Sequence, residues 1–339
     1  MKLGWTVRGL TLRTPLRISR SVMARRDAVQ VVVEHDGLRG HGEVVTSVFH
    51  DLDLDGILLS LNDFRALAVE YSAPGALLAD LPGLDHPPGV LAAVDAALHD
   101  VIGRERGVPV HALAGVPLWT DAPTAYTIGI TDPEDAALQA KALAAKGFTL
   151  LKVKLGTEHD VTAVTAVHAA APGTRLLLDP NGGWTPEHTV RVVELLTAAG
   201  VVVDALEQPI APGNPAGLAW VRDRCAVPLI ADEDAATAAD VRALAGLVDG
   251  VNVKLAKCGG IGPALEIISA ARETGVDVML GCLVASSLGI APAAHLSGHA
   301  RWVDLDGHLL LADDPWTGLG GEDGVLRLSG APGLGVAPR

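Results

Sequence analysis

The chain has 339 residues, of which 49% are hydrophobic and 19% charged, a composition typical of a folded globular protein. Its 40 Asp and Glu residues outnumber its 26 Lys and Arg residues and give a formal net charge of −14, which argues against nucleic acid or an anionic membrane surface as a partner. Residues 1–8 lack the apolar core of a secretory signal, and no apolar run reaches the roughly 18 residues of a membrane helix, so we expect a cytoplasmic protein.

The first third of the chain predicts an α+β unit. From β-branched runs and helical spacing of apolar residues, we expect strands and helices over residues 3–12, 28–34, 54–71 and 88–106. Residues 17–26, which lie between the two strands and are rich in arginine, are predicted to form a loop. The unit is expected to end within residues 113–123, where Gly and Pro interrupt the pattern.

From about residue 124, short apolar runs alternate with helices. The helices have recognisable starts, because Asp132-Pro133 and Thr185-Pro186 each place a capping side chain before a proline. The strand candidates are residues 126–130, 149–155, 175–179, 203–207, 228–232, 251–254, 277–281 and 301–304. This alternation predicts a TIM-type barrel, in which the chemistry collects at the carboxyl ends of the strands. Residues 324–328 predict one more strand, which packs back on the N-terminal unit.

Three acids end three successive strands of this predicted barrel, namely Asp179, Glu207 and Asp232. A single acid after an apolar strand is more often a turn or a helix cap. Three carboxylates around one mouth would repel each other, however, unless a hard cation neutralised them. Oxygen ligands of this kind suit Mg²⁺ better than Zn²⁺, so the sequence predicts a magnesium site.

Lysines flank the predicted cation site. Lys152 and Lys154 are two residues apart in one strand and therefore point the same way, while Lys254 closes a later strand. A lysine acts as a base only where nearby positive charge disfavours its protonated form, and Lys152 together with the cation supplies that charge beside Lys154. Lys257 is expected to be a solvated lysine at a helix start.

Five motifs stand in one order and spacing: Lys-x-Lys (152–154), Asp-x-Asn (179–181), Glu-Gln-Pro (207–209), Ala-Asp-Glu (231–233) and Asn-x-Lys-x-x-Lys-x-Gly-Gly (252–260). Together they closely resemble the enolase superfamily, specifically its muconate lactonizing enzyme subgroup. Members of this family commonly form homo-oligomers.

This resemblance implies two domains. Residues 119–312 would form a modified (β/α)₇β barrel that carries the metal and the lysines. Residues 1–118 would form an α+β capping domain, completed by residues 313–339.

The resemblance also implies how one Mg²⁺ ion is held in each active site. Its ligands would be Asp179, Glu207 and Asp232, supported by Asn181 and Glu233. Carboxylates of this kind, with Mg²⁺, stabilise the enediolate that forms when a proton leaves the carbon next to a carboxylate.

Two lysines would exchange that proton. The resemblance places Lys154 and Lys254 on opposite faces of the substrate α-carbon, with Lys152 tuning Lys154 and contacting the substrate carboxylate. Removal of the proton on one face and its return on the other inverts the carbon.

Residues 302–311 resemble the element with which dipeptide epimerases hold the α-ammonium group of the substrate, here Asp304 and Asp306. The implied activity is epimerisation of the C-terminal residue of an L,L-dipeptide, with Cys282 lining the pocket. N-acylamino acid racemase and o-succinylbenzoate synthase activities of the same subgroup are alternatives. A barrel that binds a ligand without turnover is a further alternative from another functional class.

Loops of the capping domain contact the substrate side chains in this subgroup. Candidates here are Arg20, Arg25, Arg26 and His50. The arginine with which Ala-Glu epimerases hold glutamate falls at Ser21, next to Arg20. This departure leaves the preferred side chains open.

Overall fold

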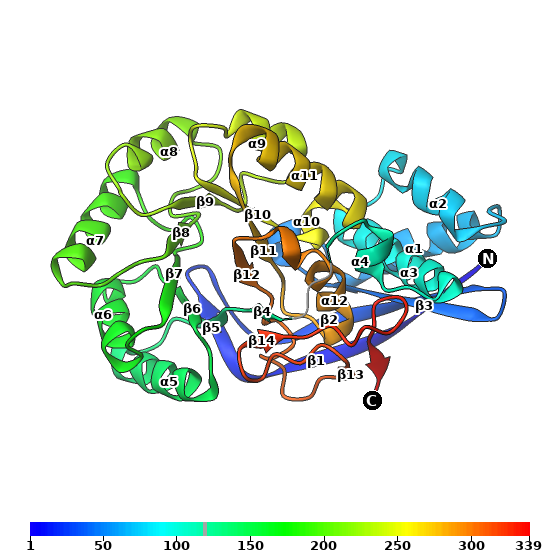
Figure 1. Ribbon diagram of the computed structural model, residues 1–339, viewed down its shortest axis with the longest axis horizontal. Helices are drawn as coiled ribbons and strands as arrows, with labels where there is room; N and C mark the ends of the chain where they lie inside the picture. Colours follow the sequence, from blue (N-terminus) through cyan, green and yellow to red (C-terminus); the bar gives the residue numbers. More distant parts are fainter. Residues whose placement is uncertain (118–120) are drawn as a thin grey trace.

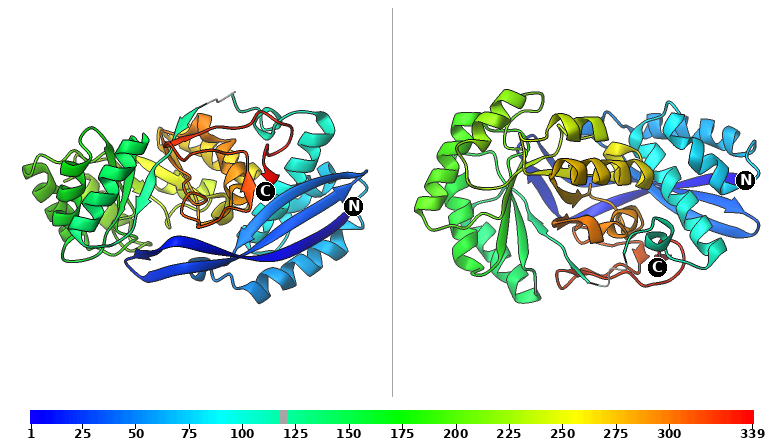
Figure 2. Two further views of the ribbon diagram at one scale, coloured as in Figure 1. Left: turned by 90° about the horizontal axis from the view of Figure 1, so that it is seen from below. Right: turned by 45° about the horizontal axis from the view of Figure 1, so that its top comes forward.

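A long antiparallel sheet opens the chain in the computed structural model, which describes residues 1–117 and 121–339 (Figure 1). Its strands are β1 (Lys2–Ile18), β2 (Ser21–His35) and β3 (Leu38–Val45), in that order. The prediction of a loop over residues 17–26 was wrong, because only Ser19 and Arg20 connect β1 to β2. The hairpin of β1 and β2 extends from this sheet to the barrel (Figure 2).

Helices α1 (Leu54–Ala68), α2 (Pro74–Asp80), α3 (Pro88–Arg106) and α4 (Val110–Leu113) follow the sheet. Short 3₁₀ turns, η1 (Val48–His50) and η2 (Leu81–Gly83), lie among them. Helix α3 packs directly on β3, where two glycines allow the close approach. A Cβ atom on Gly42 would lie 1.9 Å from the carbonyl oxygen of Ala93, and Gly40 is equally close to α3. The predicted helix over residues 88–106 is thus confirmed with its bounds.

Eight parallel strands form the second part of the molecule. They are β5 (Tyr126–Ile128), β6 (Leu150–Lys154), β7 (Arg175–Asp179), β8 (Ala205–Glu207), β9 (Leu229–Ala231), β10 (Gly250–Val253), β11 (Asp277–Gly281) and β12 (Trp302–Asp304). The order in the sheet follows the chain, from β5 to β12. Hydrogen bonds bring the two edges together, since the N–H of Ala125 donates to Val303 O at 2.8 Å.

Helices alternate with these strands around the outside of the barrel (Figures 1 and 2). They are α5 (Pro133–Lys146), α6 (Asp160–Ala170), α7 (Pro186–Ala198), α8 (Pro215–Arg222), α9 (Ala238–Ala243), α10 (Leu255–Cys258), α11 (Ile261–Thr274) and α12 (Ser287–Ala294), and η3 (Ser297–His299) precedes β12. Every strand from β5 to β11 is followed by a helix, and β12 ends the series. The predicted (β/α)₇β barrel is therefore confirmed.

The C-terminal segment runs back over both parts. Within it, β14 (Val325–Leu326) pairs with β4 (Ala122–Pro123), and β13 (Trp316–Thr317) pairs with β15 (Ala337–Pro338). The segment contacts the N-terminal part at several points: the N–H of Ala312 donates to Thr11 O at 2.8 Å, the ring of Trp316 lies edge-on to that of His41, and the N–H of Leu334 donates to Asp100 of α3 at 2.8 Å. The predicted division into a capping domain and a barrel stays a prediction, and its boundary at residues 118 and 119 lies outside the described residues. Among those residues, no helix is both long and apolar enough to cross a membrane.

Candidate active site

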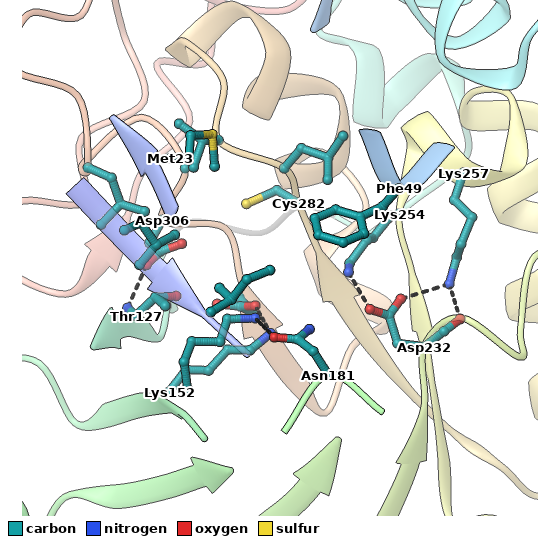
Figure 3. Close-up of a pocket in the computed structure, with 18 of the residues that line it drawn as sticks. Met23, Phe49, Thr127, Lys152, Asn181, Asp232, Lys254, Lys257, Cys282 and Asp306 are labelled. Atoms are coloured by element: carbon teal, nitrogen blue, oxygen red, sulfur yellow. Dashed lines mark hydrogen bonds and ion pairs between the residues drawn. The ribbon is translucent and has the colours of Figure 1, made fainter. Parts of the chain in front are cut away.

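A cavity of about 390 Å³ lies at the carboxyl ends of the barrel strands. Its walls come from the ends of β6, β9, β10, β11 and β12 and, from the N-terminal part, from the tip of the β1–β2 hairpin and residues 49–50 (Figure 3). A cavity at this end of a TIM-type barrel is the usual position of an active site. We refer to it as the central cavity.

Lys152 is the centre of a buried ion cluster beneath this cavity. Its Nζ lies 3.0 Å from Asp179 Oδ2, 2.6 Å from Glu207 Oε2 and 2.7 Å from Asp304 Oδ2. Burial disfavours the charged ammonium, but Asp304, Glu207 and Asp179 outweigh that effect and raise the pKa of Lys152 well above its usual value. The ammonium therefore links the ends of β6, β7, β8 and β12.

Lys154 reaches the same carboxylate from two residues further along β6. Its Nζ lies 2.6 Å from Asp179 Oδ2 and 3.2 Å from Asn181 Oδ1. Positions two apart on a strand share a face, and Lys152 and Lys154 point the same way, as the sequence predicts, so that both contact Asp179. Burial alone would raise the pKa of Asp179, but Lys154 and Lys152 lower it to about 2.

Two lysines approach Asp232 from different sides (Figure 3). Lys254, directly after β10, forms a short ion pair with Asp232 Oδ2, and Lys257 Nζ lies 3.0 Å from Asp232 Oδ1. The prediction that Lys257 is solvated was wrong, because its side chain is only 7% exposed and also donates to Asn252 O at 2.9 Å. Burial opposes the charge on Lys254, but Asp232 and Glu207 raise its pKa above the usual value.

Glu207 is fully buried at the end of β8, between the other two acids. Asn252 Nδ2 donates to its Oε1 at 2.7 Å, and the ion pair with Lys152 Nζ at 2.6 Å is the contact of its Oε2. Burial and then the negative charge of Asp179 raise the pKa of Glu207 to about 7. The neighbouring lysines therefore leave part of the repulsion between the carboxylates in place.

A divalent cation fits this set of donors. Asp179, Glu207 and Asp232 stand at the ends of adjacent strands, all three are buried, and the lysines do not fully offset the repulsion that raises the pKa of Glu207. Carboxylate oxygens are the ligands that Mg²⁺ prefers. In the structure each of these three carboxylates contacts a lysine. Among the residues that the structure describes, no three Asp, Glu, His or Cys side chains are arranged around a common point as metal ligands. The three carboxylates are the residues that would hold the ion.

Asp304 and Asp306 form the wall contributed by the end of β12. The backbone N–H of Thr127 donates to Asp306 Oδ2 at 2.6 Å, while Asp304 is bound to Lys152. Burial and then Asp304 raise the pKa of Asp306 to about 7. Cys282, after β11, lies on the same wall. Sequence reasoning missed Thr127, and no sequence signal marks it, since it acts through a backbone group that every non-proline residue carries.

The arginines of the hairpin have different environments. Arg20 lines the central cavity but is paired with Glu233 at 2.9 Å and lies over Phe49. Arg25 is exposed, pairs with Asp27 at 3.1 Å and lies outside the cavity. Arg26 lines the cavity, and so does His50. The substrate contacts of Arg20 and Arg25 stay predictions.

Comparison with known proteins gives one consistent result. Residues 135–339 match the family described as enolase C-terminal domain-like. The chain is 33% identical to an L-Ala-D/L-amino acid epimerase from Pedosphaera parvula, over 98% of this chain and 97% of that protein. It is also 33% identical to a hydrophobic dipeptide epimerase from Roseobacter litoralis, over 99% and 98% of the two chains.

Among solved structures, a dipeptide epimerase from Enterococcus faecalis in complex with Mg and the dipeptide L-Leu-L-Tyr superposes with a TM-score of 0.92. The two chains are 29% identical, and the match covers 99% of each. Fold and sequence similarity therefore extend over the N-terminal part as well as the barrel.

Proposed function

This chain belongs to the enolase superfamily, and on that basis we propose that it is a Mg²⁺-dependent dipeptide epimerase that inverts the α-carbon of the C-terminal residue of an L,L-dipeptide. It is an isomerase. One observation carries the proposal: Lys154 and Lys254 reach the central cavity from separate strands, and a pair of acids at the end of β12 lines the same cavity.

In the proposed reaction the two lysines act on one carbon from opposite sides. The neutral Nζ of Lys154 takes the α-proton, and the protonated Nζ of Lys254 gives a proton to the other face. When the two lysines exchange these roles, the same steps convert the product back to the substrate. Because one group removes the proton and a different group returns it, the configuration inverts.

The remaining residues bind and orient the substrate. Asp304 and Asp306 hold the α-ammonium group of the first residue, and Lys152 keeps Asp304 in place through its 2.7 Å contact. When bound by Asp179, Glu207 and Asp232, Mg²⁺ supplies positive charge for the substrate carboxylate as negative charge develops on it.

The test is isotope exchange. The protein is incubated in D₂O with MgCl₂ and a dipeptide library, and mass spectrometry and ¹H NMR follow the α-position of the C-terminal residue. We expect deuterium to enter there together with inversion. Lys154→Ala and Lys254→Ala should each lose at least about 10³-fold in kcat/KM, since each removes a general acid or base. Absence of exchange with every dipeptide would refute the proposal.

Asp306→Asn separates this activity from the N-acylamino acid racemase and o-succinylbenzoate synthase alternatives. Asparagine keeps the oxygen that accepts from Thr127 but loses the negative charge that would hold an ammonium group. We expect kcat/KM for dipeptides to fall about 100-fold. Turnover that is unaffected, or that occurs only with N-acylated amino acids, would favour the alternatives.

A further inference from the structure

Four arginines, Arg17, Arg20, Arg25 and Arg26, lie at or near the tip of the β1–β2 hairpin. Arg20 is paired with Glu233, and Arg25 with Asp27. Among the residues that the structure describes, Arg17 and Arg26 form no ion pair with Asp or Glu, and of these two only Arg26 is partly buried, since Arg17 is exposed. Within residues 1–117 and 121–339, the one protein acceptor of Arg26 is Val284 O, at the long distance of 3.4 Å. A guanidinium has five N–H donors, so most of those on Arg26 are free.

The alternation of the strand explains why Arg26 differs from its neighbour. Arg25 and Arg26 are opposite Thr11 and Leu10 in the β1–β2 register, and successive side chains of a strand point to opposite faces. Arg25 consequently faces solvent, and Arg26 faces the central cavity and the residues after β11. Burial lowers the pKa of Arg26 to about 10, so the guanidinium is charged at neutral pH.

The surroundings of Arg26 favour a ligand that is apolar along its length and anionic at its end. Val284, whose carbonyl Arg26 contacts, and Met23 both line the cavity. A groove of about 600 Å³ beside the hairpin also shares Met23 and Arg26 with the cavity. Removing a guanidinium from water without a counter-charge is costly, and a substrate carboxylate would offset that cost.

We propose that Arg26 is the specificity-determining residue of this site and binds a carboxylate on a side chain of the dipeptide substrate. The inference rests on the proposed function. It differs from the arginine expected from the family resemblance, since that position is Ser21 and Arg26 lies on β2 beyond it. The cavity then has two charged ends for one substrate, with acids on β12 for the ammonium group and Arg26 for the side-chain carboxylate.

The experiment compares Arg26→Met with the wild type on matched dipeptides. The substrates are Ala-Glu and Ala-Gln, in which the second side chain differs by one charge, and Glu-Ala and Gln-Ala, in which the first one does. We expect kcat/KM of the wild type to favour the acidic member of one pair, and that preference to fall about 30-fold in Arg26→Met. The pair that responds identifies the side chain that Arg26 binds.

Control variants make the result interpretable. Arg39→Met removes an exposed arginine of the same sheet, whose side chain is 68% exposed, and should change neither preference. Turnover of Ala-Gln or Gln-Ala by Arg26→Met shows that the variant is folded and active. Arg26→Lys should retain part of the preference, because it keeps the charge without the planar fork.

Two results would overturn the inference. One is an equal loss on acidic and neutral dipeptides in Arg26→Met, which would mean that Arg26 contacts a group shared by all dipeptides. The other is an unchanged preference. Failure of the proposed function itself is distinct, because the wild type would then exchange no α-deuterium with any of the four dipeptides.

Discussion

Lys257 binds Asp232 through both a side-chain and a backbone oxygen, and also binds Asn252 O. It therefore fixes the carboxylate that Lys254 also contacts. The sequence could not reveal this, because a lysine after a strand end looks the same whether it faces solvent or a buried acid. What decides between the two is the position of the end of β9, which belongs to a different part of the chain.

Lys257→Met is expected to destabilise the protein by about 3 kcal/mol, since removing one partner of a buried ion pair leaves the other uncompensated. Urea unfolding followed by circular dichroism measures the change. Lys146→Met, at an exposed position in the last turn of α5, is the control and should stay within about 0.5 kcal/mol of the wild type. A similar, small effect of both variants would contradict the role assigned to Lys257.

At the scale of elements, the β1–β2 hairpin docks on the barrel by close contact with loops after the strands. Arg17 O accepts from the N–H of Ile130 at 2.8 Å, and a Cβ on Gly156 would lie 2.7 Å from Cβ of Ser19. Glycine is required at position 156 for a second reason, its φ of +128°.

Gly156→Ala is accordingly expected to displace the hairpin tip and raise KM several-fold, with a loss of about 1–3 kcal/mol in stability. Gly173→Ala is the matched control, because Gly173 also has positive φ, +87°, but faces open space. Gly173→Ala should lower the free energy of unfolding in urea, because alanine is strained at this φ, without changing KM. Equal KM values for both variants would argue against docking of the tip as a requirement for binding.

Helix α12 is followed directly by His295, a buried histidine with both ring nitrogens in use. The N–H of His111 donates to His295 Nδ1 at 3.1 Å, and Nε2 lies 3.1 Å from Leu334 O. This pattern requires the neutral ring with its proton on Nε2. Burial lowers the pKa of His295 to about 4, against an ordinary value of 6.5.

Stability should therefore fall as the pH drops from 6.5 toward 4. The unfolded chain binds a proton in this range and the folded protein does not, which shifts the equilibrium toward unfolding by up to about 3 kcal/mol. Above pH 6.5 the ring of His295 is neutral in both the folded and the unfolded state, so its lowered pKa no longer reduces the free energy of unfolding. Urea titrations at several pH values should show a shallower dependence for His295→Gln than for the wild type, and parallel curves would disprove the assignment.

The barrel strands were predictable because they are short apolar runs, several of which end in a polar residue, as at Asp179 and Glu207. The ends of β6 and β7 agree with the predicted ranges to within one residue. The hairpin tip was not predictable, since both faces of residues 17–26 carry polar side chains. Their strand conformation depends on the barrel loops against which they pack.

At the scale of the whole molecule, we expect the proposed binding of Mg²⁺ to the buried carboxylates to make stability depend on the cation. Saturating MgCl₂ at 100 times its dissociation constant should stabilise the folded state by about 2.7 kcal/mol. For a chain of 339 residues we expect a rise of roughly 4 °C in Tm. Glu207→Gln keeps an acceptor for Asn252 but removes one ligand charge. A rise of equal size in this variant, or with NaCl of equal ionic strength, would count against these ligands.

Asp100 gives the fold a particular order of assembly on the ribosome. This buried carboxylate of α3 accepts from the N–H of His41 at 2.9 Å and from the N–H of Leu334 at 2.8 Å. The second donor is 234 residues later in the chain, which corresponds to roughly 10 s or more of synthesis. The N-terminal part therefore reaches its final hydrogen bonding only after translation of the barrel is complete, and a nascent chain carries an unfinished domain until then.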